Sequence, residues 1–429
     1  MNASVAQAVS GGSSGFLARF EGLRSLLPGD PDRRAQGADL FRANGLPGRR
    51  DEAWHYTNLR LLSEASFQEP LTAVADCAAL LARLPNVEYP RIVFVDGRFR
   101  GDLSAAPQDL PPGATLSTFA RAPDFGSLTR PDRENMVALN TMLAEDGARI
   151  AVAEGVDGGT IMLVSLATEQ PGRATAFHPR HSIRLARGAR LSVLEVSVGT
   201  GTYLHNPVSE IQLAVDSHLS HVRLQDEART AFHLSTLYAA IAGGATYDSF
   251  ALNLGARLAR TEIHATLTGP GATVHLNGAQ LLNGNQHGDI TTVVRHEAPG
   301  CASRQTIKNV LSGRSRGVFQ GKIEVARVAQ KTDGYQMNQA LLLSPEAEID
   351  CKPELEIFAD DVKCSHGATV GELDRDQLFY LRARGVKLPQ ARAMLVRAFL
   401  TEALDAVADD TIREALEAAV ARWWESETI

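Results

Sequence analysis

Apolar side chains near the N-terminus recur at the period of an α-helix. They lie at Phe16, Leu17, Phe20, Leu23 and Leu26, before a Pro-Gly-Asp-Pro sequence at 28–31 breaks the pattern. A β-forming run at 91–95 leads into an Asp-Gly turn, the Pro- and Gly-rich stretch 105–130 is expected to be loop, and 134–144 predicts another helix. Residues 1–149 are therefore expected to form a mostly helical N-terminal region.

Short β-rich segments separated by Gly, Pro, Asn or Asp fill residues 150–372. Gly-Ala pairs at 188–189, 244–245 and 271–272 each introduce an alternating strand, and similar starts recur at intervals of roughly 20–30 residues, as in solenoid repeats. No helical stretch is long enough for βαβ crossovers. The pattern alone predicts a β core and leaves a parallel β-helix and a β-sandwich both open.

The helical pattern returns over residues 373–429. Asp374 is placed to cap a first helix that stops at Gly385, and two further helices follow. Their apolar positions are Ala391, Met394, Leu395, Ala398 and Phe399 in one, and Ile412, Leu416 and Trp423 in the other. Because a solenoid leaves open strand edges at its ends, these helices are expected either to cap such an end or to dock a partner.

Composition and charge limit the kinds of protein and partner that this chain can be expected to represent. An apolar content of 44% in 429 residues is enough for a sizeable core, while a net charge of -7 disfavours a nucleic-acid partner. The first residues lack the features of a secretory signal, and no window is long and apolar enough to span a membrane. Four scattered cysteines indicate reduced thiols. A cytoplasmic protein with no membrane partner is expected.

The densest group of potential ligands lies at 360–371, DDVKCSHGATVG. Cys364 and His366 are two residues apart, so on a strand they point to the same face, and thiolate with imidazole suits iron or zinc. Cys351 could join them if its strand stacks beside theirs. Three soft ligands are one fewer than a closed site needs. The group is therefore either a buried Cys with a structural His, or a metal site that a second subunit completes.

Other residues with chemical potential give weaker patterns. His264, His275, His287 and His296 have no metal-ligand spacing, so turn or surface roles are expected for them. Asp360 and Asp361 are adjacent and would face opposite sides of a strand, which does not suit a pair flanking one glycosidic bond. The stretch 317–323 lacks the first Gly and the Ser/Thr of a phosphate loop, so any nucleotide would be bound by a partner.

Several longer stretches resemble the SufB/SufD family of the SUF iron–sulfur cluster assembly system. They are KTDGYQMNQA at 331–340, LLLSPEAEIDCKPELEI at 341–357, ADDVKCSHGATVG at 359–371 and DQLFYLRARG at 376–385, with DEAWHYTNL at 51–59 upstream. The resemblance covers roughly residues 50–400. The form CSHGATVG and the moderate length of the chain are similar to the SufD branch of the family rather than the SufB branch.

The resemblance implies a mainly β fold, with a right-handed parallel β-helix core flanked by helical N- and C-terminal regions. It also implies a non-catalytic scaffold in a complex of one SufB, one SufD and two SufC ATPase subunits, with the two β-helices meeting edge to edge. His366 would then hold a transient iron–sulfur cluster beside a SufB cysteine. Cys364 matches the motif with a weaker case, and Cys351 is expected to be structural.

Two further expectations concern partners and the alternative function. The apolar faces of the C-terminal helices, around Met394, Phe399 and Leu404, are expected to dock the SufC-type ATPase, and the isolated chain could form a homodimer. The alternative to a scaffold is a β-helical carbohydrate-active enzyme, which would be active as a single chain and depend on carboxylates.

Overall fold

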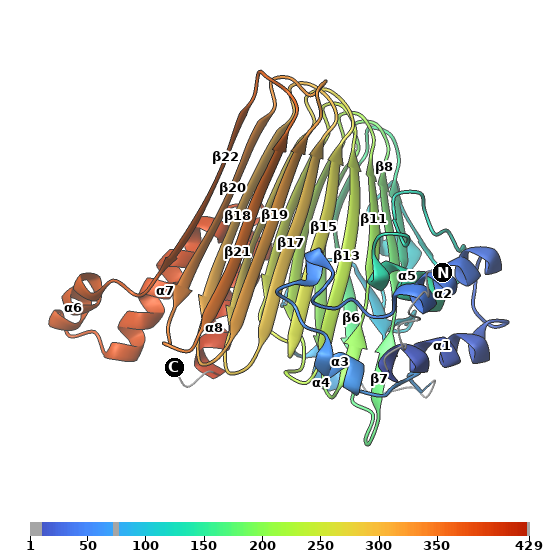
Figure 1. Ribbon diagram of the computed structural model, residues 1–429, viewed down its shortest axis with the longest axis horizontal. Helices are drawn as coiled ribbons and strands as arrows, with labels where there is room; N and C mark the ends of the chain where they lie inside the picture. Colours follow the sequence, from blue (N-terminus) through green and yellow to red (C-terminus); the bar gives the residue numbers. More distant parts are fainter. Residues whose placement is uncertain (1–10, 72–76, 427–429) are drawn as a thin grey trace, which may run out of the picture.

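Two sheets of mainly parallel strands wind around a common interior along most of the chain (Figure 1). The computed structural model describes residues 11–71 and 77–426. It is a parallel β-solenoid with helices on its flanks, so the predicted mainly β fold with a parallel β-helix core is confirmed and the β-sandwich is excluded.

Each coil of the solenoid contributes one strand to each sheet. Sheet A runs in the order β21 (Glu348–Ile357), β19 (Arg316–Val325), β17 (His287–His296), β15 (Leu258–Leu267), β13 (Phe232–Ile241), β11 (Val208–Leu213), β8 (Arg180–Leu185), β5 (Ala148–Val152) and β4 (Ala114–Thr118), with β1 (Phe67–Gln68), β7 (Ala174–Phe177) and β10 (Tyr203–His205) beside this path. Sheet B runs in the order β22 (Lys363–Gly371), β20 (Asp333–Leu342), β18 (Ala302–Leu311), β16 (Thr273–Leu282), β14 (Thr246–Asn253), β12 (His218–Asp226), β9 (Arg190–Gly199), β6 (Asp157–Ala167), β2 (Arg91–Val95) and β3 (Arg98–Phe99).

The Gly-Ala pairs act as predicted, at the turns that lead into strands of sheet B. Gly188, Gly244 and Gly271 adopt positive φ angles of 64°, 67° and 71°, which a side chain would oppose. The alanine after each glycine is fully buried, and β9, β14 and β16 begin directly after these pairs. The glycine turns the chain and the alanine fits the crowded corner of the solenoid.

The two ends of the solenoid are finished differently. At the start, β3 pairs antiparallel with β2 and β4 pairs antiparallel with β5. These two antiparallel strands are the first edge strands of the two sheets. The loop expected over 105–130 was wrong for β4, because pairing with β5 gives this segment a strand conformation that its composition does not reveal. At the other end, within the described residues, β22 pairs only with β20, and β21 only with β19. This end, formed by β21, β22 and the turn between them, is called the open edge below.

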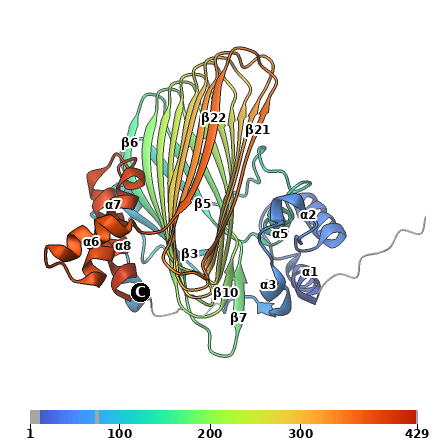
Figure 2. The same cartoon turned by 60° about the vertical axis from the view of Figure 1, so that its left-hand side comes forward.

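The helices cover the outer faces of the sheets, as Figure 2 shows from the side. N-terminal helices α1 (Gly11–Leu23), α2 (Pro31–Asn44), α3 (Arg60–Glu64) and α5 (Asn135–Leu143) lie beside sheet A, and α4 (Ala78–Leu81) contributes to the apolar cluster on sheet B. Residues 51–59 hold this N-terminal region against sheet A. Trp54 stacks on the buried guanidinium of Arg260 at 4.1 Å, and Thr57 hydrogen-bonds to Asp289 of β17.

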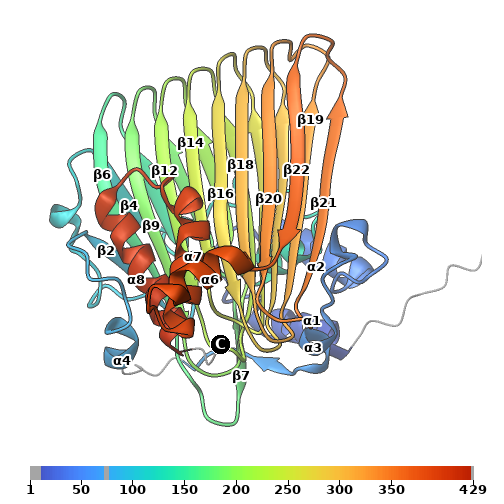
Figure 3. The same ribbon diagram turned by 90° about the vertical axis from the view of Figure 1, so that its left-hand side faces the viewer.

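The C-terminal helices are α6 (Arg375–Ala383), α7 (Leu388–Leu404) and α8 (Asp410–Ser426). The Asp374 carboxylate accepts hydrogen bonds from the N–H groups of Asp376 and Gln377, so the predicted helix cap is confirmed. Figure 3 shows α7 and α8 lying across sheet B, where Leu400 and Leu416 join its apolar cluster. A cap over the solenoid end was therefore the wrong expectation, because sheet B has an apolar outer face that these helices bury.

No helix within 11–71 and 77–426 has the length and apolar character needed to cross a membrane.

Candidate functional site at the open edge

The residues singled out for metal binding lie on the last strand of sheet B. In the register of β20 and β22, Cys364 stands opposite Gly334 and His366 opposite Gln336. Gly334 and Gln336 are buried and face the interior of the solenoid, and paired residues of parallel strands point to the same side. Cys364 and His366 therefore share the interior face, as the alternation predicted. His366 is exposed because no further coil covers it.

The two cysteines of the open edge differ from His366 in their surroundings. Cys364 is half-buried and packs against the small cluster that contains Ile323 and Val325. Cys351 on β21 packs against the cluster that contains Phe319. Burial raises the pKa of the Cys364 thiol and raises that of Cys351 to about 11. Both are therefore neutral thiols near pH 7, and a bound metal or a new neighbour would be needed to deprotonate them.

One chain does not assemble a complete metal site at the open edge. In the described part of the chain, groups of three ligand-type side chains within 4.8 Å of one another occur at two other places, and neither includes Cys351, Cys364 or His366. The structure therefore also has too few ligands here, as inferred from the sequence. Cys364 and His366 share a face, and Cys351 does not lie close enough to form a group of three with them. Such a pair supplies two of the four ligands that a closed metal site needs.

Large apolar side chains also lie exposed at the open edge. Ile357, Phe358 and Val370 belong to the open edge, and Val370 is 56% exposed. They accompany the unpaired backbone groups of β21 and β22, which a further strand could pair. Exposed apolar side chains beside an open strand edge are typical of an interaction surface rather than a solvated end.

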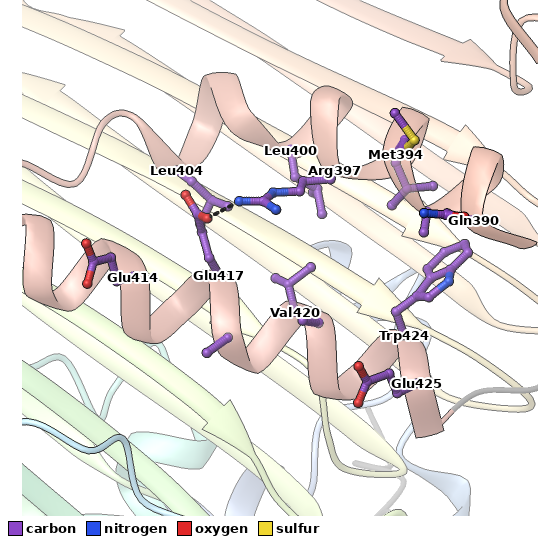
Figure 4. Close-up of a pocket in the computed structure, with 14 residues that line it drawn as sticks. Gln390, Met394, Arg397, Leu400, Leu404, Glu414, Glu417, Val420, Trp424 and Glu425 are labelled. Atoms are coloured by element: carbon purple, nitrogen blue, oxygen red, sulfur yellow. Dashed lines mark hydrogen bonds and ion pairs between the residues drawn. The ribbon is translucent and has the colours of Figure 1, made fainter. Parts of the chain in front are cut away.

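A second candidate surface lies between α7 and α8. A cavity of about 510 Å³ lies there. Figure 4 shows Leu400, Val420 and Trp424 among the residues that line it, with the Arg397–Glu417 ion pair across it. Met394 on its rim is 46% exposed. Beside it, α6 buries none of its residues and exposes Phe379 and Tyr380. The helices thus bury one face on sheet B and leave an apolar groove on the other.

The remaining sequence expectations have mixed outcomes. Asp360 and Asp361 are exposed in the turn between β21 and β22, as a solvated pair would be. The stretch 317–323 lies inside β19, which excludes a phosphate loop there. Surface roles for the histidines were wrong for His264 and His296, which are buried within strands. Each has a polar partner in the fold, Glu262 for His264 and Ser303 for His296. Glu262 and His264 are two residues apart on one strand, so their spacing could have signalled the first pair, whereas the second joins two different strands.

Comparisons with known proteins agree with the family resemblance found in the sequence. A family model described as "SUF system FeS cluster assembly, SufBD core domain" matches residues 166–399, and one for the "SufBD protein N-terminal region" matches residues 31–161. The chain is 34% identical over 384 residues to the iron-sulfur cluster assembly protein SufD of Escherichia coli, covering 88% of this chain and 89% of that protein.

Two more distant relatives extend the match beyond one organism. A SufBD family protein of Synechocystis is 31% identical over 397 residues, covering 88% of this chain and 87% of its own length. The chloroplastic protein ABCI7 of Arabidopsis thaliana is 29% identical over 399 residues, covering 89% and 83%. With its solenoid, its flanking helices and these matches along most of its length, the chain belongs to the SufBD family of iron–sulfur cluster assembly proteins.

Proposed function

We propose that the chain is a non-catalytic scaffold subunit that assembles iron–sulfur clusters where its open edge meets a SufB-type paralogue. It works in the cytoplasm and docks a SufC-type ATPase through its C-terminal helices. The observation that carries the proposal is the position of His366, exposed on the interior face of the last strand of sheet B and two residues from a thiol. A partner strand placed against this edge would add ligands to an incomplete Cys/His pair.

The chemistry of the pair suits iron in a shared site. A neutral imidazole and a thiolate are ligands for iron, and Cys364 needs a neighbouring cation to lose its proton because burial raises its pKa. Ligation would then begin at the exposed His366, with the thiol recruited once iron is present. Because each subunit would supply half of the ligands, a cluster would form only in the assembled complex. The cluster is cargo that the complex passes on.

The backbone of the open edge supplies the other half of the argument. The outer N–H and C=O groups of β21 and β22 have no further strand within the described chain, and Phe358 and Val370 are exposed beside them. An edge-to-edge partner would pair the backbone and cover these side chains. In the absence of the paralogue, a second copy of the chain would present the same edge, which explains how the isolated chain would form a homodimer.

The groove between α7 and α8 fits the ATPase. Its apolar walls and charged rim can receive a helix or loop of a partner, and α7 and α8 are fixed to sheet B on their other side. Movement of a docked ATPase would be transmitted to the same sheet that carries Cys364 and His366. This arrangement links nucleotide-driven motion to the cluster site without nucleotide binding by this chain.

The test is the metal content of the complex purified from cells that express the chain with its SufB-type and SufC-type partners. His366→Ala is expected to leave the melting temperature and subunit stoichiometry unchanged while removing most of the iron and acid-labile sulfide. Ser365→Ala is the matched control, because Ser365 is exposed on the same strand and faces the opposite side. Cys351→Ala is expected to leave iron content unchanged.

Normal iron content in the His366→Ala complex would mean that the site lies elsewhere. Loss of assembly with this variant would make the histidine an interface residue rather than a ligand. The alternative of a β-helical carbohydrate-active enzyme requires that the isolated chain cleave a polysaccharide and lose that activity on changing Asp360 and Asp361 to Asn.

A further inference from the structure

A second group of ligand-type side chains lies deep in the fold, far along the solenoid from the open edge. His205 is the last residue of β10, His233 is the second residue of β13, and Glu227 lies in the turn between β12 and β13. His205 and His233 stand opposite each other in the register of β10 and β13. Their side chains are 1% and 8% exposed and that of Glu227 is 1% exposed. Two successive coils and the turn between them thus bring together residues that no local spacing connects.

The contacts within this group are short and converge on one carboxylate. His205 Nδ1 lies 3.0 Å from Glu227 Oε1, and His233 Nδ1 lies 2.7 Å from Glu227 Oε2. All three ligand atoms lie within 4.8 Å of one another. The rings of His205 and His233 meet edge to face at 4.9 Å, so both nitrogens approach the carboxylate from different directions. This convergence is the geometry of a ligand set around one centre.

Hydrogen bonding leaves this group incompletely satisfied. His233 Nδ1 is not aligned for a hydrogen bond despite its short distance, and His205 Nε2 has no hydrogen-bond partner, although both atoms are fully buried. A buried polar atom without a partner is unfavourable, so His233 Nδ1, which faces the carboxylate of Glu227, marks a place where a further group is expected. Gln225 Nε2 donates to Glu227 Oε2 over 2.9 Å and fixes the orientation of the carboxylate.

The charge of the group also favours a cation. The buried carboxylate of Glu227 has the two imidazoles as its nearest partners. Two imidazoles and one carboxylate form a ligand set for zinc or ferrous iron that leaves a further coordination position open.

We infer that His205, Glu227 and His233 form a buried site for one resident divalent transition-metal ion. Each imidazole offers the lone pair of Nδ1 once its proton lies on Nε2, and Glu227 supplies one oxygen. The ion would link β10 to β13. It would thereby hold β7 and β10, which lie beside the main path of sheet A, against the solenoid. Glu227 also borders a cavity of about 490 Å³ beside Arg83 and Trp423, which gives an approach from outside. Both zinc and ferrous iron fit this chemistry.

The test uses the full chain with Cys364→Ser and His366→Ala, which removes the ligands of the open edge and makes the result independent of the function proposed above. After treatment with a chelator, the protein is titrated with Zn²⁺, and with Fe²⁺ under anaerobic conditions, against a chromophoric competitor. One ion per chain is expected, and Glu227→Gln is expected to weaken its binding by more than about 100-fold. The ion that is retained on purification identifies the natural occupant, because zinc binds most nitrogen and oxygen sites more tightly than ferrous iron whichever ion the cell supplies.

Glu195→Gln is the matched control. Glu195 is also a buried carboxylate, and its Oε2 lies 2.9 Å from Nε2 of His221, but it belongs to no triad of ligand atoms. This variant is expected to keep metal affinity within about threefold of the parent, since it removes a charge without removing a ligand. Equal losses in both variants would show that general destabilisation, and not ligation, changes the affinity, and would overturn the site.

The site is also overturned if the parent binds no ion, which would make the group a hydrogen-bonded structural triad. Should Glu227→Gln fail to fold, the parent protein loaded with Co²⁺ decides the matter. Visible bands of low-symmetry nitrogen and oxygen coordination, without thiolate-to-cobalt charge transfer, support the assignment. A thiolate charge-transfer band would place the ion on a cysteine and refute it.

Discussion

Gln336 and His366 stand directly opposite each other on the last two strands of sheet B, yet one is fully buried and the other exposed. Both face the interior side of the solenoid. Gln336 is covered by the coil that contains His366, and its Nε2 donates to the carbonyl of Glu354. The same position in successive coils is therefore core in one and an accessible imidazole in the next.

This relationship predicts that substitution of Gln336 lowers stability and that substitution of His366 hardly changes it. Gln336→Ala is expected to lower the free energy of unfolding by about 1–3 kcal/mol, because it leaves a cavity and an unpaired carbonyl. His366→Ala is expected to change it by less than about 0.5 kcal/mol, as at other exposed positions. Urea unfolding of the isolated chain measures both. A loss above about 1 kcal/mol for His366→Ala would mean that the histidine supports the fold.

Val370 tests the open edge as an interface. Val370→Lys is expected to leave the stability of the isolated chain unchanged, because the side chain is already exposed, and to weaken association with the SufB-type partner by more than about tenfold by burying a charge. Leu26→Lys is the control, since Leu26 is 77% exposed and lies after α1, away from the open edge. Unchanged affinity of the Val370→Lys protein in a calorimetric titration would exclude this edge as the contact.

Met394 tests the groove between α7 and α8. Met394→Glu is expected to abolish copurification of the SufC-type ATPase while the SufB-type partner is retained, because it places a charge on the rim of an apolar groove. Deletion of the helices is a poorer test, since it would expose the apolar face of sheet B. Leu61→Glu is the control, as Leu61 is exposed to a similar degree, at 48%, on α3. ATPase recovery equal to the control would place docking elsewhere.

Glu134 predicts a pH dependence of stability. Burial and the nearby charge of Glu262 raise the pKa of Glu134 to about 9. Between about pH 4.5 and about pH 9 the folded state therefore binds a proton that the unfolded state has lost, and the free energy of unfolding falls as pH rises through this window. Glu134→Gln is expected to flatten that fall and to raise the melting temperature more at the alkaline end than at the acid end.

Melting temperatures across this pH window check the prediction, with Glu154→Gln as the control because that carboxyl group is exposed. A parallel shift of the Glu134→Gln curve at every pH would show that Glu134 does not titrate within the window.

Local features of the sequence determined much of this protein. Gly-Ala starts fix the turns because only glycine adopts positive φ without strain, and alternation fixes which side chains of a strand share a face. That was enough to predict a β core, the cap at Asp374 and the shared face of Cys364 and His366. Each depends on residues a few positions apart, which the printed sequence shows directly.

Tertiary structure decided what depends on distant pairing. That β4 is a strand, that α7 and α8 cover sheet B rather than the end of the solenoid, and that His264 and His296 are buried all follow from contacts between segments far apart in the chain. His205, Glu227 and His233 show the reason most clearly. Their convergence is set by the parallel register of successive coils, and register arises from packing along the whole solenoid rather than from any spacing in the sequence.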